Sequence, residues 1–121
     1  MLIKDFEKCQ EIIAGDNCIL RELLNPLKDS IAIRYSLAVA KVKPNEITYA
    51  HKIKSTEVYY ILQGEGEMHI NNEKEKVFAG QAVYIPPNAV QRIKNIGKKD
   101  LIFLCIVDPA WRKQDEEVIN L

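Results

Sequence analysis

The sequence predicts an all-β fold, a single small β-barrel or sandwich, for this chain of 121 residues. Two observations favour it: short β-like runs follow one another, and hardly any stretch between them has helical periodicity. A third is that Gly, Pro and Asn residues separate the runs at close intervals. We expect one domain over residues 1–121, with the barrel core at about 17–108 and a tail at 109–121.

The strands are expected where β-branched and aromatic residues gather between turns. The first run, Ile31–Val42, is apolar and β-branched, and it ends at Lys43-Pro44-Asn45-Glu46. Gly64-Glu65-Gly66 is typical of a turn, and Asn71-Asn72-Glu73 of a hairpin tip. The other expected strands are Glu57–Leu62, Glu67–Ile70, Lys76–Phe78, Ala82–Ile85, Val90–Asn95 and Leu101–Val107.

Helical signals are confined to the two ends of the chain. Asp5–Ile13 is expected to form one short helical stretch. The tail predicts a second, Trp111–Leu121, because Pro109 suits a first helical turn and Asp108 can cap it. Trp111 is expected to pack the tail onto the barrel, with a position over a pocket as the alternative. The apolar residues that would attach the tail are Val118, Ile119 and Leu121.

Alternation along the strands predicts which side chains share a face. In Glu57–Leu62, the odd-numbered residues lie on one face and the even-numbered residues on the other. Both faces are largely apolar, and the same holds for Leu101–Val107. Only one face of a barrel strand is interior, so the other needs a further layer, which a second copy of the chain supplies most simply. A homodimer is therefore predicted.

Charge and cysteine usage narrow the classes of partner and location. Lys plus Arg number 17 and Asp plus Glu number 17, so there is no electrostatic reason to expect nucleic acid or an anionic membrane as partner. No C-x-x-C pair occurs among the three cysteines, and Cys105 is expected to be a buried small residue. Without a secretory signal or a long apolar run, the expected location is cytoplasmic.

Two spaced motifs lie in the middle of the chain. The first follows G-x5-H-x-H-x3-E-x6-G, at positions Asn45, His51, Ile53, Glu57 and Gly64. The second follows G-x5-P-x-G-x2-H-x3-N, at positions Gly80, Pro86, Asn88, Gln91 and Asn95. In this order, joined by residues 65–79, they resemble the motifs of the cupin superfamily. The resemblance covers residues 45–95 and implies a small single-domain cupin, a double-stranded β-helix or jelly-roll barrel.

Four motif positions depart from the family pattern, in two different ways. Asn45 and Asn88 replace glycines, and asparagine is among the few residues that tolerate a positive φ, so these turns are expected to be kept. Ile53 and Gln91 stand where the family has two of its histidines. These two departures leave the fold unchanged but alter the site.

The resemblance implies a site inside the barrel that holds a divalent metal. Carried over by position, the ligands would be His51, Glu57 and Gln91, whereas Ile53 cannot coordinate a metal. One imidazole, one carboxylate and one amide oxygen form a harder and weaker set than three imidazoles with a carboxylate. Such a set could still hold Zn, Fe, Mn or Ni with water completing the shell. Ile53, Tyr59 and Ile93 are expected to contact a ligand in the same pocket.

A metal-free site is the alternative. His51, Glu57 and Gln91 could instead form a buried hydrogen-bond network or bind a polar ligand directly. A glutamate on an apolar strand face needs some partner, because an unpaired buried carboxylate is costly. The sequence leaves both alternatives open.

Three functions follow from these alternatives. The first is a metal-binding cupin that acts on a small polar molecule, with isomerase or lyase chemistry favoured over oxygenation because the two-histidine, one-carboxylate triad is incomplete. The second is a non-catalytic module that binds or senses a ligand without metal. The third is a structural subunit whose interface matters more than its pocket.

Overall fold

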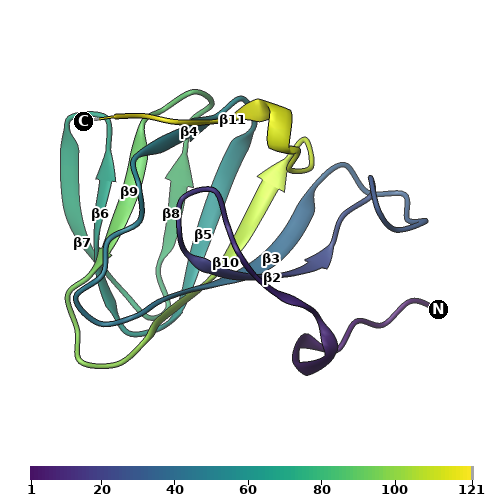
Figure 1. Cartoon of the computed structure of the whole chain (residues 1–121), viewed down its shortest axis with the longest axis horizontal. Helices are drawn as coiled ribbons and strands as arrows, with labels where there is room; N and C mark the ends of the chain where they lie inside the picture. The colour runs from purple at the N-terminus through teal and green to yellow at the C-terminus, as the bar shows by residue number, and fades with distance from the viewer. Residues whose placement is uncertain (121) are drawn as a thin grey trace.

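The computed structural model describes residues 1–120 and consists mainly of antiparallel strands in two sheets that face each other (Figure 1). This confirms the predicted all-β fold. The six-stranded sheet contains, in order, β1 (Glu11–Ile13), β2 (Ile19–Leu24), β3 (Ser36–Val42), β10 (Leu101–Asp108), β5 (Thr56–Gln63) and β8 (Ala82–Ile85). The five-stranded sheet contains β11 (Glu116–Val118), β4 (His51–Ile53), β9 (Gln91–Asn95), β6 (Glu65–Ile70) and β7 (Glu73–Phe78).

The core lies between the two sheets and follows the predicted alternation. In β10 every second side chain is buried, beginning with Leu101, and Phe103 packs its ring 4.4 Å from that of Tyr59 on β5. In β9, Gln91, Ile93 and Asn95 are buried. Cys105 is buried as predicted. The inward faces of the strands therefore form one apolar cluster into which a few polar side chains are built.

Asparagine and glycine supply the positive φ angles of the turns. Asn45 and Asn88 have φ of 68° and 63°, which confirms that they preserve the turns where the family has glycine. Gly64 has φ of 91°, and a Cβ there would lie 2.9 Å from the backbone oxygen of Asp100. Gly64 is therefore required by its backbone angle and by the close approach of the neighbouring chain.

Asn88→Ala is expected to lower the free energy of unfolding by about 1–2 kcal/mol, because alanine pays a steric cost at positive φ. Asn88→Gly is expected to stay within about 0.5 kcal/mol of the parent protein. Urea denaturation of both variants measures the difference. Asn72→Ala, on an exposed hairpin residue without positive φ, is the matched control, and an equal loss there would contradict the explanation.

The two ends of the chain are mostly extended: each contains one short 3-10 turn within the range expected to be helical, and the longer helical stretches do not form. The N-terminal segment forms a single 3-10 turn, Phe6–Lys8, and then β1, which pairs with β2. The tail forms a 3-10 turn, Lys113–Asp115, and then β11, which pairs with β4. In both segments the backbone N–H and C=O groups form hydrogen bonds with a neighbouring strand, β2 or β4, instead of the hydrogen bonds of a helix. Leu121, predicted to attach the tail, lies outside the described residues.

Neither 3-10 turn within residues 1–120 is long or apolar enough to cross a membrane.

Candidate functional site

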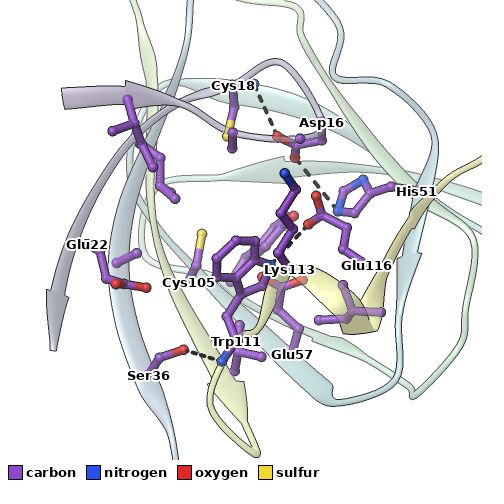
Figure 2. A pocket seen from close by; sticks show the side chains of 18 of the residues that line it. Asp16, Cys18, Glu22, Ser36, His51, Glu57, Cys105, Trp111, Lys113 and Glu116 are labelled. Carbon is purple, nitrogen blue, oxygen red and sulfur yellow. Dashed lines mark hydrogen bonds and ion pairs between the residues drawn. The ribbon is translucent and has the colours of Figure 1, made fainter. Parts of the chain in front are cut away.

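A cavity of about 370 Å³ lies inside the barrel, at the end bordered by the β1–β2 hairpin and the C-terminal tail (Figure 2). Its walls come from β2, β3, β4, β5 and β10, with the β1–β2 hairpin and the tail at its edge. Four predicted site residues line it: His51, Ile53, Glu57 and Tyr59. The other two, Gln91 and Ile93, do not line the cavity and are buried behind its wall.

Gln91 connects two of the cavity residues. Its amide oxygen accepts a hydrogen bond from the Tyr59 hydroxyl at 2.9 Å, and its amide nitrogen donates to Glu57 Oε1 at 3.1 Å. Only 1% of Gln91 is exposed. Because both ends of the amide are engaged inside the protein, Gln91 orients Glu57 and Tyr59 rather than facing a ligand.

Glu57 is a buried carboxyl group with a raised pKa. Burial raises its pKa to about 8, and the charges of Asp16 and Glu116 act in the same direction, whereas the Gln91 hydrogen bond opposes them. At neutral pH the carboxyl is therefore mostly protonated and presents a hydrogen-bond donor. A neutral carboxylic acid is the group expected when no cation compensates a buried carboxylate.

His51 is held in one orientation by the backbone. Its Nδ1 lies 3.1 Å from the carbonyl oxygen of Tyr49, and an N–H at this position fits that contact. Nε2 is then the atom on the cavity side, 3.8 Å from Asp16 Oδ2. With the proton on Nδ1, the lone pair of Nε2 would be directed at the cavity.

Several lining residues were missed by the sequence interpretation because they come from the chain ends. Asp16 reaches the cavity from the β1–β2 hairpin, where its Oδ1 accepts a hydrogen bond from the Cys18 backbone at 3.1 Å. Lys113 and Glu116 come from the tail, together with Trp111, for which a position over a pocket was one of the two expected alternatives. No local pattern in the sequence marks these residues, since their position depends on pairing between distant segments.

Hydrogen bonds made by Trp111 attach the tail to the rest of the protein. The Trp111 backbone N–H donates to Ser36 Oγ at 3.0 Å, and its carbonyl accepts from Asn25 Nδ2 at 3.1 Å. The indole Nε1 donates to Glu116 Oε2 at 3.2 Å, and Glu116 packs against Gly15 of the hairpin. Trp111 thus both packs the tail and lines the cavity, which combines the two predicted roles.

The predicted ligand set does not fit a divalent metal as it is arranged. Gln91 uses its oxygen to accept from Tyr59, and Ile53 offers no donor atom. Within residues 1–120, no three His, Cys, Asp or Glu side chains are placed to hold a metal ion together. Metal binding through His51, Glu57 and Gln91 therefore stays a prediction.

Gln91→Met is expected to lower the free energy of unfolding by about 2–4 kcal/mol, because the Tyr59 hydroxyl and the Glu57 carboxyl lose their partner inside the protein. Methionine has a similar volume, so the loss reports hydrogen bonding rather than a cavity. Arg92→Met, on the opposite face of β9, is the control and is expected to stay within about 0.5 kcal/mol. Equal effects in urea denaturation would contradict the role given to Gln91.

The family model of the cupin domain matches residues 38–107 of this chain. A curated relative, the uncharacterized protein MJ1618 of Methanocaldococcus jannaschii, is 39% identical over 117 residues, which are 96% of this chain and 93% of the relative. The oxalate-binding protein of Thermotoga maritima is 34% identical over 68 residues, 55% of this chain and 56% of the relative.

Among solved structures, the polyketide cyclase RemF from Streptomyces resistomycificus is similar with a TM-score of 0.81 and 19% identity. The match covers 100% of this chain and 87% of the cyclase. At this identity the likeness concerns the fold alone.

Proposed function

Because the chain belongs to the cupin domain family, we propose that it binds a small molecule inside its barrel through protein side chains, without a metal ion. The observation that carries this proposal is the Tyr59–Gln91–Glu57 network, which engages the amide expected to be a ligand. The cavity volume of about 370 Å³ is at the small end of the range for ligand sites. Apolar walls would supply contact area, while His51 and Glu57 would supply one acceptor and one donor.

Proton transfer is the second candidate function, favoured because His51 and the protonated carboxyl of Glu57 both line the cavity. His51 would remove a proton from a carbon beside a carbonyl, and Glu57 would give its proton to the carbonyl oxygen, which forms an enol. For a substrate with a hydroxyl group on that carbon the intermediate is an enediol, and return of the His51 proton to the former carbonyl carbon, with transfer of the proton of the other hydroxyl to Glu57, would complete an isomerisation. The sequence analysis favoured isomerase or lyase chemistry for a metal-binding site; here the same class of reaction is assigned to the two side chains.

A divalent metal held by His51 and Glu57 is the competing proposal, and elemental analysis separates the two. Protein purified without chelators or metal columns is expected to contain well under one Zn, Fe, Mn or Ni per chain. Benzyl alcohol, a neutral probe, is expected to change the fluorescence of Trp111 equally with and without EDTA, since Trp111 lines the cavity and is the only tryptophan. One metal per chain that is lost in both His51→Ala and Glu57→Ala would overturn the metal-free proposal.

We further propose that two copies associate through the outer face of the six-stranded sheet. Tyr60, Leu62 and Tyr84 on this face are 40%, 47% and 62% exposed, beside half-buried Leu104 and Ile106 of β10. A sheet face of this composition is typical of an interface between subunits.

Tyr60→Lys is expected to shift the protein from dimer to monomer at micromolar concentration, because it places a charge opposite Leu104 in the apolar face. Sedimentation equilibrium measures the change. Lys74→Ala on the charged edge strand β7 is the control. A parent protein that is monomeric at the same concentration would contradict the proposal.

A further inference from the structure

The charged side chains that line the cavity are mainly acidic. Lys113 is the only lysine or arginine of the lining, whereas the carboxyl groups are Asp16, Glu22, Glu57 and Glu116. Glu22 is already compensated by Lys28, whose Nζ lies 2.7 Å from its Oε1. Glu57 Oε1 is already engaged, since it accepts a hydrogen bond from Gln91 Nε2 at 3.1 Å. Asp16 and Glu116 therefore determine the charge that a ligand would meet.

Asp16 is a buried carboxylate with one oxygen directed at the cavity. The residue is 6% exposed, and Oδ1 is occupied by the Cys18 backbone N–H. The ion-pair contact recorded for Oδ2 among residues 1–120 is with His51 Nε2, at 3.8 Å, which is too long for a hydrogen bond. Figure 2 shows Asp16 and His51 directed toward one another at the edge of the cavity. Asp16 thus has an acceptor available for a donor that enters the cavity.

Aromatic side chains make up much of the remaining wall. Tyr59, Phe103 and Trp111 all line the cavity, and the Tyr59 and Phe103 rings pack together. The Trp111 indole already attracts a cation, since Lys28 Nζ lies 5.9 Å from its ring centroid. Carboxylates combined with aromatic faces are the composition with which proteins recognise organic ammonium groups.

We propose that the ligand of this cavity is a small organic amine with an apolar or aromatic body. Its ammonium group would donate to Asp16 Oδ2 and lie near Glu116, and its body would contact the aromatic wall and the apolar residues of β1 and β2. This inference rests on the proposed metal-free ligand site. It also distinguishes this chain from its relative named for oxalate binding, because a dianion would meet two carboxylates and a single lysine.

Lys113 opposes the ligand that the cavity would otherwise favour. In Figure 2 its side chain extends from the tail toward the side where Asp16 lies. An ammonium ligand would be repelled by this like charge and would compete with it for the same carboxylates. Removing the Lys113 charge should therefore strengthen the binding of an amine and weaken that of an anion.

Three probes with one ring and different headgroup charges test the inference: benzylamine, benzyl alcohol and benzoate. Titration at pH 7 in EDTA, followed by Trp111 fluorescence, is expected to rank benzylamine tightest and benzoate weakest, with about tenfold between the amine and the alcohol. Asp16→Asn keeps the size of the side chain and is expected to abolish that difference, so that benzylamine binds no more tightly than benzyl alcohol. Lys113→Gln is expected to strengthen benzylamine binding several-fold, and Lys98→Gln, on an exposed residue outside the cavity lining, is the control.

The possible outcomes distinguish a failure of the ammonium inference from a failure of the metal-free ligand site. Binding of benzyl alcohol without preference for the amine, or a preference that survives Asp16→Asn, overturns the ammonium inference and leaves the metal-free ligand site standing. Tighter binding of benzoate than of benzylamine does the same. No fluorescence change with any of the three probes overturns both, and far-UV circular dichroism of each variant verifies that it has folded.

Discussion

Glu57→Gln is expected to make the protein roughly 3–5 kcal/mol more stable than the parent at pH 9 and equally stable at pH 4. The reason is that the folded protein keeps the Glu57 carboxyl protonated at pH values at which the unfolded chain has released this proton. The pKa of this carboxyl is raised from 4.5 to about 8, first by burial and then by Asp16 and Glu116, against the Gln91 hydrogen bond. Between these two values the unfolded chain releases the proton while the folded protein keeps it. The free energy of unfolding therefore falls as pH rises through this window and levels off above about 8.

The comparison of parent and variant isolates Glu57, because the remaining titrating groups are shared. Glutamine keeps the oxygen that accepts from Gln91 Nε2 at position Oε1. Urea denaturation at several pH values between 4 and 9 measures the difference. Glu65→Gln, an exposed carboxylate on β6, is the control and is expected to show less than about 0.5 kcal/mol at any pH. A parent-to-variant difference that does not change with pH would contradict a raised pKa at Glu57.

Ile53→His combined with Gln91→His is expected to convert the cavity into a metal site with about one divalent ion per chain. Positions 51 and 91 are directly paired across β4 and β9, and positions 51 and 53 are buried on the same face of β4. Two new imidazoles would join His51 and Glu57 in the pattern that the family motif implies. At free zinc 100 times above the dissociation constant, bound metal would raise the free energy of unfolding by about 2.7 kcal/mol.

Elemental analysis and thermal unfolding with and without Zn²⁺ measure this gain. The single variant Gln91→His is the matched control, since it removes the amide network but leaves Ile53 in place. Adding Glu57→Gln to the double variant is expected to weaken the metal site strongly. A parent protein that binds Zn²⁺ as tightly as the double variant would contradict the view that Ile53 and Gln91 prevent metal binding.

The strands and their faces could be predicted because they depend on short-range patterns. Alternation placed Glu57 and Tyr59 on one face of the strand, and both side chains are buried in β5. Asn45 and Asn88 could be assigned to positive φ from residue type alone, since few residues other than glycine tolerate it. Local patterns were less informative at the ends of the chain. There, segments with helical signals pair as strands with the edges of the two sheets.

The candidate site was only partly predictable, for two physical reasons. His51 and Glu57 follow from motif spacing, since a strand determines the direction of each side chain. Gln91 has the predicted direction, but its hydrogen bonds depend on Tyr59, which a spacing rule does not describe. Asp16 and Glu116 depend on the meeting of segments that are far apart in the chain, and nothing in the local sequence indicates that meeting.

The contact between Glu116 and Gly15 has a consequence for how such a protein diversifies. The β1–β2 hairpin and the tail both border the cavity, whereas most strands of the two sheets lie behind them. Insertions, deletions and charge changes in these two segments would therefore change which compounds enter the cavity, with little effect on the stability of the barrel. Exchange of terminal segments between related barrels is a direct route to new selectivity.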